Sequence, residues 1–404
     1  MISSKKNLWK PISPVEDPTI FKFLSHIYQF IVKEKTFKDL GIYTGKMGNC
    51  LFLFHFLRFK KHPLDEAYQM LQAINEELLD IDSLSEKKSL ELCEFGRFTF
   101  ILYHEGFLNK EKIEDVTSEF DPLFLRCMSM ALQAKFYNLY TGALNWGLYF
   151  LEKYIIFHKE SDKRALEVFI ELLLEKSTNI SEDKIGWENI LSLKYPDTRG
   201  YNLGFPYGIG SIIQFCSRLY QLGISKNETE DIISRSLNLL LESRQDKLSN
   251  IKTLFPYGVK CDLSVITGDS PLSWSGGDLM IATVLKNTLL NHSLKSSLKI
   301  KENFDDILNN FERRLELDLK IKENNIMAGK AGIAITLNSL YQSTNDPRLK
   351  DYVLFWQENM LNSEMEKKSN DDNSLICGLS GIGLVLLANL ETQKPYWISN
   401  ILLL

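Results

Sequence analysis

Cysteine and histidine are the residue types in this chain that are best suited to bind a metal or to supply a nucleophile. The chain has six of each, and the cysteines stand apart from one another: Cys50, Cys93, Cys127, Cys216, Cys261 and Cys377. None are paired as C-x-x-C, and a disulfide framework would be denser and in a shorter chain. This usage predicts free thiols in a reducing, cytoplasmic compartment.

Two carboxylates stand beside glycines and could do acid–base chemistry. Glu94 lies two residues before Gly96, and Asp278 follows Gly277. Glycosidases use two carboxylates about 5 to 9.5 Å apart, so carbohydrate hydrolysis is one hypothesis. The competing interpretation is structural: Asp278 would stabilise the start of a helix, and Glu94 would pair with Arg97. We favour the structural role for Asp278.

Composition and charge exclude several classes of protein. The net charge is −5 and the basic residues are interspersed with acidic ones, which argues against a nucleic-acid-binding protein. No apolar stretch reaches 18 residues, so no membrane span is predicted, and no apolar run follows the lysines of residues 1–11, so no secretory signal is predicted. Phosphate-binding loops, EF-hands and Ser-His-Asp arrangements are also missing from the sequence.

The elements that position these residues are predicted to be helices, arranged in a repeat. Seven times, a glycine is followed three residues later by a second glycine or a mostly modest-sized residue, and usually then by an apolar run. The first glycines are 46 to 69 residues apart, which accommodates two helices and their connections. This predicts an all-α chain of about seven helical hairpins. The copies are Gly45/Gly48, Gly96/Thr99, Gly142/Asn145, Gly208/Ser211, Gly277/Met280, Gly329/Gly332 and Gly378/Gly381.

Each repeat glycine is expected to lie where a loop enters a helix. There it lets the chain turn tightly and lets neighbouring helix starts approach, and those starts would offer N–H groups to a polar ligand. The long steps on either side of Gly208 predict surface-loop insertions over 178–202 and 246–273. The polar stretch 363–374 is either an interdomain linker or a loop between hairpins. We prefer the loop, and so a single domain over 1–404, and leave open whether residues 1–18 are ordered.

Residues around these glycines resemble motifs of the lanthionine synthetase C-like family. Residues 203–212 (LGFPYGIGSI) resemble its G-x-x-H-G-x-x-G segment, residues 272–278 (LSWSGGD) its W-C-x-G-D segment, and residues 375–382 (LICGLSGI) its C-H-G-x-x-G segment. Residues 137–142 resemble the segment that carries an acid before its glycine. The order and separations fit over nearly the whole chain. The resemblance implies an α/α toroid fold and a precursor peptide as partner.

The resemblance also implies a zinc ion, which active members hold through two cysteines and a histidine. Zinc makes a peptide thiol a thiolate, which adds to a dehydrated residue and closes a thioether ring. Carried onto this chain, the two cysteine positions fall on Ser275 and Ile376, and the histidine position falls on Cys377. Isoleucine cannot ligate a metal, serine is a poor zinc ligand, and Cys377 would stand alone. We therefore predict no metal cofactor.

The remaining chemical positions of the family are changed as well. The histidine of G-x-x-H-G falls on Tyr207, the acid falls on Asn138, and an arginine falls on Pro271. A neutral Asn138 can hydrogen-bond a peptide amide but cannot transfer a proton, and the ordinary pKa of tyrosine, about 10, makes Tyr207 a poor proton shuttle. A relocated site using Cys261 or His104 is a minor alternative.

These replacements favour a non-catalytic protein that binds a precursor peptide, or a partner enzyme, in the modification of ribosomally made peptides. The runner-up hypothesis is an active thioether-forming enzyme, with Cys377 or Tyr207 in a non-zinc role or with a relocated metal site. Aromatic residues near the glycines, including Tyr43, Tyr140, Trp146 and Tyr257, are candidates to contact the peptide. The predicted peptide-binding mouth consists of Asn138, Tyr207, Trp274, Ser275, Asp278 and Cys377.

Overall fold

The computed structural model places most of the chain in helices, grouped in two compact units. Unit 1 comprises residues 1–118, 322–402 and 404, and unit 2 comprises residues 119–321 and 403. None of the described helices is long and apolar enough to cross a membrane. The structure describes residues 9–14, 17–34, 37, 39–79, 85–191, 198–245, 251–264, 266, 269–270, 272–291, 297–366 and 372–404.

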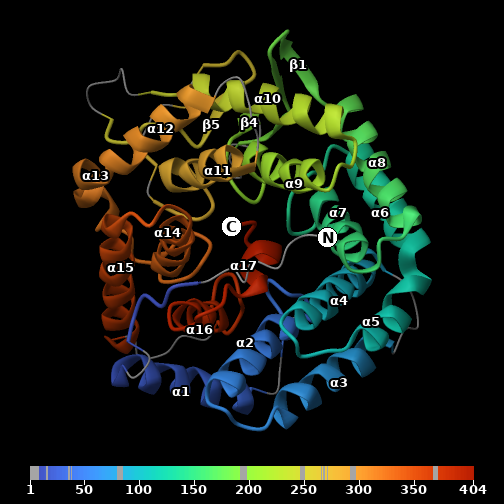
Figure 1. Cartoon of the computed structure of the whole chain (residues 1–404), viewed down its shortest axis with the longest axis vertical. Coiled ribbons are helices and arrows are strands. Elements are labelled where there is room, and N and C mark those ends of the chain that lie inside the picture. The colour runs from blue at the N-terminus through green and yellow to red at the C-terminus, as the bar shows by residue number, and fades with distance from the viewer. Residues whose placement is uncertain are drawn as a thin grey trace. The chain divides into compact units, whose positions relative to one another are not determined.

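Unit 1 is built on four helices whose side chains are buried on nearly every face. They pack side by side in the order α14, α16, α2, α4 (Figure 1). Helices that are apolar all round belong in the interior of a protein, and these four form the inner layer of the unit. They are α2 (Lys46–Phe59), α4 (Glu86–His104), α14 (Lys330–Thr344) and α16 (Leu379–Ala388).

Amphipathic helices cover this inner layer. The first of them, α1, buries apolar residues at spacings of three and four, as the sequence predicts, and Asp17 caps its start by accepting the N–H groups of Thr19 and Ile20. In the described contacts, α1 packs on α2 and α16, α3 on α2, and α15 on α14. The covering helices are α1 (Pro18–Lys33), α3 (Asp65–Leu79), α5 (Lys110–Thr117) and α15 (Pro347–Glu366). The short helix α17 (Tyr396–Ile401) packs on α4.

Unit 2 repeats the same two-layer plan. Its inner helices are α7 (Ala143–Phe157), α9 (Ile209–Gln221) and α11 (Gly277–Asn291), which pack in that order. Each packs against the helix that follows it in the chain, so three helical hairpins result. The other helices are η1 (Ser118–Phe120), α6 (Asp121–Gln133), α8 (Glu160–Glu175), α10 (Lys226–Glu242), α12 (Ser297–Asn309) and α13 (Phe311–Asp318).

The two insertions contain short strands, so the prediction of plain surface loops was wrong there. Strands β1 (Thr178–Ser181) and β2 (Lys184–Gly186) form a hairpin. A second antiparallel sheet joins β3 (Asn189–Ile190), β4 (Arg199–Asn202) and β5 (Gly258–Lys260) in that order. Tyr201 opposite Val259 is buried in this sheet. A backbone that is buried in this way needs hydrogen-bond partners, and strand pairing supplies them.

Six of the seven repeat glycines start a helix, as predicted. Five are the N-caps of α2, α7, α9, α14 and α16, and Gly277 is the first residue of α11, with a φ of 72° that favours glycine. Gly96 is the exception, because it lies inside α4. That helix already begins after Ser85, whose hydroxyl caps it by accepting the N–H of Lys88.

The predicted loop over 363–374 was also partly wrong, because α15 continues to Glu366. Pro271, which stands at the family's arginine position, lies outside the described residues, as does the segment 1–8.

Candidate functional site

The repeat glycines close a recurrent loop, which we call the helix-start loop. The described helix-start loops span residues 39–45, 136–142, 202–208, 323–329 and 372–378. In each, the N–H of a residue one or two places after the glycine donates to a carbonyl seven residues earlier, as from Lys46 to Asp39 (3.1 Å) and from Leu379 to Asp372 (2.9 Å). The loop thus satisfies N–H groups that the sequence had led us to expect a ligand to use.

Close packing within the loop explains why its last residue is glycine. A Cβ atom at Gly45, Gly208 or Gly378 would lie 2.3 Å from the carbonyl oxygen of the sixth residue before it. The backbone at Gly45 is extended, with φ of −120°, so the requirement is for space and not for an unusual dihedral angle. Any larger residue would have to open the loop.

The residue before the glycine is one that every described helix-start loop presents to solvent. This position is exposed in all five helix-start loops, while the glycine that follows is buried. Two of the predicted site residues, Tyr207 and Cys377, occupy it. The exposed residues are Thr44, Thr141, Tyr207, Ala328 and Cys377.

Backbone hydrogen bonds join neighbouring helix-start loops within each unit. In unit 1, the N–H groups of Ile326 and Met327 donate to the Ile376 carbonyl, and the Ile376 N–H donates to the Tyr43 carbonyl at 3.0 Å. In unit 2, the Leu139 N–H donates to the Pro206 carbonyl at 3.0 Å. Since these bonds fix one loop against the next, the exposed side chains of each unit stand on a pre-formed surface.

In unit 2, this surface is aromatic. Tyr207 is 42% exposed, and its ring meets that of Tyr140 edge to face at 5.9 Å between centroids. Asn138 is buried, and its side-chain oxygen accepts the N–H groups of Tyr140 and Thr141 at 2.9 and 2.8 Å. Asn138 therefore shapes the loop that carries Tyr140, a role that its sequence position did not predict.

A third tyrosine, Tyr257, joins the helix-start loop of α9 to the segment before α11. Its carbonyl accepts the Leu203 N–H at 3.1 Å, and its hydroxyl is hydrogen-bonded to the side chain of Asn202. Its ring lies against Gly276, where an added Cβ would be 3.2 Å from the ring. Tyr257 is 38% exposed, so it is a further exposed aromatic side chain beside the helix-start loop of α9.

Other predicted aromatic and polar site residues are less accessible. Trp274 is fully buried, with its ring 5.9 Å from that of Phe205. Ser275 is half-buried, and its hydroxyl lies 3.3 Å from that of Ser273. Tyr43 and Trp146 are buried as well. These side chains can support a surface, while Tyr207 and Tyr257 can contact a ligand.

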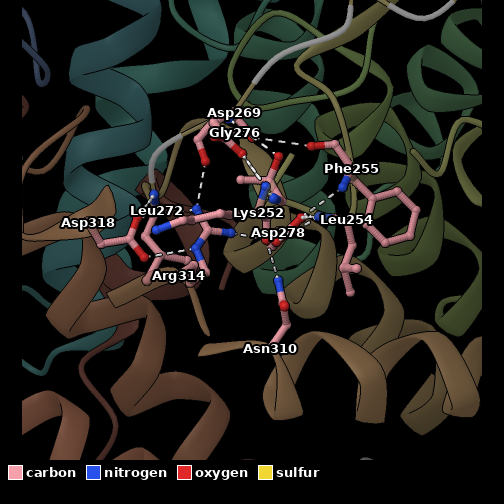
Figure 2. A network of polar contacts seen from close by, with 12 residues as sticks. Lys252, Leu254, Phe255, Asp269, Leu272, Gly276, Asp278, Asn310, Arg314 and Asp318 are labelled. Atoms are coloured by element: carbon pink, nitrogen blue, oxygen red, sulfur yellow. Dashed lines mark hydrogen bonds and ion pairs between the residues drawn. The ribbon is translucent and has the colours of Figure 1, made fainter. Parts of the chain in front are cut away.

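Asp278 is fully buried in the first turn of α11 and takes part in a charged network (Figure 2). Its carboxylate accepts the N–H groups of Leu254 and Phe255 and a hydrogen bond from Arg314. Arg314 also binds Asp318, with Nε donating at 2.8 Å. Burial raises the pKa of Asp278, and Arg314 opposes that rise. Asp278 thus binds Arg314 and backbone N–H groups of a segment distant from α11. The sequence had led us to expect that it would stabilise the start of its own helix.

Arg314 is a residue that sequence reasoning missed. Its spacing of four from Asp318 was a signal for an ion pair on α13, but nothing in the sequence connected either residue to Asp278. Removing one member of a fully buried ion pair costs about 3 to 5 kcal/mol, because a charge is left without a partner.

The family's zinc-ligand positions in this chain do not fit a zinc ion. Ile376 is buried and offers only hydrocarbon, since its N–H and carbonyl are used to link loops. Desolvation raises the pKa of the Cys377 thiol, and the carboxylates of Asp372 and Glu323 raise it further. The thiol therefore resists becoming the thiolate that zinc binds. Within the described ranges, no three His, Cys, Asp or Glu side chains are grouped to hold a metal ion.

The residues considered for other chemistry have local roles. Glu94 is buried and accepts the Ile42 N–H at 2.8 Å, so, like Asp278, it is not open to a sugar. The His104 ring stacks on Tyr396 at 3.9 Å between centroids. Cys261 is exposed in the turn after β5, and desolvation, together with Glu188 and Asp262, raises the pKa of its thiol.

Known proteins are similar to this chain in both sequence and fold. A family model described as "Lanthionine synthetase C-like protein" matches residues 36–403. The chain belongs to the lanthionine synthetase C-like family. Among solved structures, nisin cyclase is similar, with a TM-score of 0.72 and 16% sequence identity over 95% of this chain and 96% of that chain. No curated protein matches the sequence.

The likeness to nisin cyclase shows the fold of this lanthionine synthetase C-like protein and confirms the predicted all-α toroid class. The motif resemblance on which the prediction rested is confirmed with it. The helix-start loops of the chain therefore belong to a known scaffold, and their exposed residues are the natural place to seek its function.

Proposed function

We propose that this lanthionine synthetase C-like protein binds a precursor peptide, or a partner enzyme that holds one, in the modification of ribosomally made peptides, and that it does so without catalysing a reaction. The observation that carries the proposal is the set of side chains at the family's zinc positions. A half-buried serine, a buried isoleucine and a thiol with a raised pKa replace three metal ligands.

The environment of Cys377 also argues against a nucleophilic role without zinc. A thiol attacks as its thiolate, and cysteines that react readily have a lowered pKa beside cations. Cys377 has the opposite surroundings, since Asp372 and Glu323 are the charged groups that affect it. Asn138 cannot act as a general acid or base, and both of its N–H acceptor contacts serve its own loop.

The surface of unit 2 supports a binding role. Tyr207, Tyr140 and Tyr257 offer large, rigid rings with polar ends, which are favoured in protein interfaces because few torsions are frozen on binding. The hydrogen bonds within and between helix-start loops hold the surface in place before a ligand arrives, which lowers the entropic cost of binding. Trp274 and Asp278 would support this surface from below, and Ser275 would lie at its edge.

The proposal includes a cytoplasmic setting. All six cysteines are free thiols, and three of them are buried in the core of inner helices. Free thiols are typical of a reducing compartment.

Isothermal titration with the precursor peptide encoded in the same gene cluster tests the proposal. We expect saturable binding by protein treated with a chelator, and a weaker affinity for Tyr207→Ala. Binding that appears only when zinc is added, or thioether formation from a dehydrated peptide, would instead establish the active enzyme of the alternative hypothesis. Failure to bind the peptide or any maturation enzyme would refute the proposal.

A further inference from the structure

We infer that Arg314 is a positioning residue that fixes Tyr257 in the aromatic surface of unit 2. The inference rests on the proposed function only in treating Tyr257 as part of a binding surface. Arg314 joins three pieces of chain, and none of the other contacts drawn in Figure 2 holds all three together.

The guanidinium group makes contacts in three directions. One nitrogen donates to Asp278 on α11, Nε donates to Asp318 on α13 itself, and a third nitrogen donates to the carbonyl of Ser270 at 2.6 Å. The side chains of Arg314 and Asp278 are fully buried, and that of Asp318 is 1% exposed. A planar fork with several donors suits this arrangement, and a lysine ammonium could not reproduce it.

The network holds both arms of the segment between α10 and α11. The first arm, residues 251–255, is held because Asp278 accepts the N–H groups of Leu254 and Phe255. The second arm, which carries Asp269, Ser270 and Leu272, is held because Arg314 binds the Ser270 carbonyl and Asp318 accepts the Leu272 N–H at 3.0 Å. A change at Arg314 would therefore free both arms together.

Other contacts join the arms to each other and to the start of α13, where Asn310 is the N-cap. Asp269 accepts the N–H groups of Lys252 and Thr253 at 2.6 and 3.1 Å. The Asn310 side chain donates to the Lys252 carbonyl at 2.7 Å. These contacts align the arms, but Asp269 is exposed, so the buried anchor is Arg314.

Tyr257 lies directly beyond the first arm. Phe255, which Asp278 holds, is two residues before it, and Gly276, against which its ring rests, is two residues before Asp278. Tyr257 in turn accepts the N–H of Leu203, in the helix-start loop that presents Tyr207. The path from Arg314 to the aromatic surface thus runs through Asp278, Phe255 and Tyr257.

A buried ion network is a costly way to hold a fold together. Well-packed apolar residues of similar size often stabilise a protein as much or more, and in some proteins buried polar groups serve instead to fix one geometry. In this protein, that geometry is the place of Tyr257.

The test replaces the network with neutral side chains of similar size and observes Tyr257. Protein containing 3-fluorotyrosine gives fluorine NMR signals, and loss of one signal in Tyr257→Phe assigns Tyr257. In the triple variant Arg314→Met/Asp278→Asn/Asp318→Asn we expect the Tyr257 signal to shift or broaden. Amide exchange should rise about tenfold or more in residues 251–264 and 272–276. Arg314→Lys, which keeps the charge and loses the fork, should change the same signal by a smaller amount.

A matched control removes a different buried ion pair of unit 2. Glu152, on α7, is fully buried and pairs with Arg218, on α9. Glu152→Gln/Arg218→Met should leave the Tyr257 signal unchanged, even if it lowers the melting temperature equally. An unchanged Tyr257 signal and unchanged exchange in the triple variant would overturn the inference, as would equal changes in the control.

The outcome is separable from the proposed function. Wild-type protein that binds no peptide refutes the proposed function, whatever the fluorine spectra show. A triple variant with an unperturbed Tyr257 refutes the positioning role, whatever the wild-type protein binds.

Discussion

The helix-start loops of unit 1 and unit 2 share their backbone hydrogen bonds but present different surfaces. In unit 1, the first residue of every loop is acidic and the exposed residue is small. In unit 2, the first residue is Phe136 or Asn202, and the residue before the glycine is Thr141 or Tyr207, with the Tyr207 ring beside that of Tyr140. The unit 1 residues are Asp39, Glu323 and Asp372, followed by Thr44, Ala328 and Cys377. Both units thus share the backbone of the loop, while the side chains at two positions set what each loop can bind.

The second repeat position shows a matching difference. After the three helix-start loops of unit 1 it is always glycine, because a Cβ at Gly332 or Gly381 would lie 1.9 or 1.8 Å from a carbonyl oxygen of its own loop. In unit 2 the position carries Asn145 or Ser211, and the Ser211 hydroxyl donates to the Gly208 carbonyl at 2.8 Å. The unit 1 loops therefore leave less space at this point, and the unit 2 loops use a side chain there.

Replacing the second glycine of a unit 1 repeat should have the largest effect on stability. It tests whether the loops of the two units differ in the space they leave at this position. Gly381→Ala should lower the free energy of unfolding by about 3 kcal/mol, because the loop must open to admit the methyl group. Ser211→Ala should cost only about 1 kcal/mol, the value of one hydrogen bond. Urea denaturation measures both. Equal costs would show that the loops of the two units have the same space.

Much of this fold could be predicted, because the repeat glycines and the apolar periodicity are local signals. The inner helices, with nearly every side chain buried, follow from apolar runs after each glycine. Gly96 misled the prediction, because a glycine tolerated inside a helix resembles one at its start until the cap at Ser85 is considered. The pairing of β4 with β5 joins residues about 60 apart, such as Tyr201 and Val259, which a short-range pattern does not reveal.

The site was predictable to a smaller extent. Motif register identified Tyr207 and Cys377, which the structure places at exposed positions. Exposure of neighbouring residues was not predictable, since Trp274 and Asp278 lie within four residues of Ser275 yet are fully buried. Arg314 was missed because its partner Asp278 is 36 residues away.

The pH dependence of stability tests the effect of a buried carboxyl group in unit 2. In unit 2, burial raises the pKa of Asp162 to about 6, although Lys153 opposes the rise. The folded protein then binds a proton that the unfolded chain releases near pH 4, so this group's contribution to stability falls as pH rises from about 4 to about 6. Asp162→Asn should be more stable than wild type by about 2 kcal/mol at pH 7, with little difference at pH 4.

Lys153 keeps Asp121 as a partner in that variant, so a simple loss of its ion pair is avoided. Thermal unfolding at several pH values checks the expectation. A difference between Asp162→Asn and wild type that does not change between pH 4 and pH 7 would contradict it.

Substitutions at the exposed loop position should lower peptide affinity more in unit 2 than in unit 1. Tyr207→Ala should weaken binding of the precursor peptide about tenfold, because it removes a large exposed ring from the aromatic surface. Thr44→Ala, at the same loop position in unit 1, should change the dissociation constant by less than about twofold. Isothermal titration measures both variants. An equal loss in the two variants would mean that the aromatic surface is not the main contact.

Reactivity of Cys377 should show the smallest effect. Asp372→Asn should increase its rate of alkylation by iodoacetamide at pH 8 about two- to threefold, because one of the carboxylates that raises the thiol pKa is removed. In both proteins the rate should rise with pH through pH 9. The experiment uses a background with Cys261→Ser and Cys127→Ser, since these two thiols are not fully buried. A slower or unchanged rate in Asp372→Asn would show that the Asp372 carboxylate does not raise the pKa of the Cys377 thiol.

Zinc stoichiometry tests the central claim most directly. The chain is equilibrated with zinc, freed of loosely bound metal by gel filtration, and analysed by mass spectrometry of the elements. The account predicts far less than about one zinc per chain, since a catalytic zinc needs three protein ligands. About one zinc per chain, lost in Cys377→Ser, would contradict it and would restore the enzyme hypothesis.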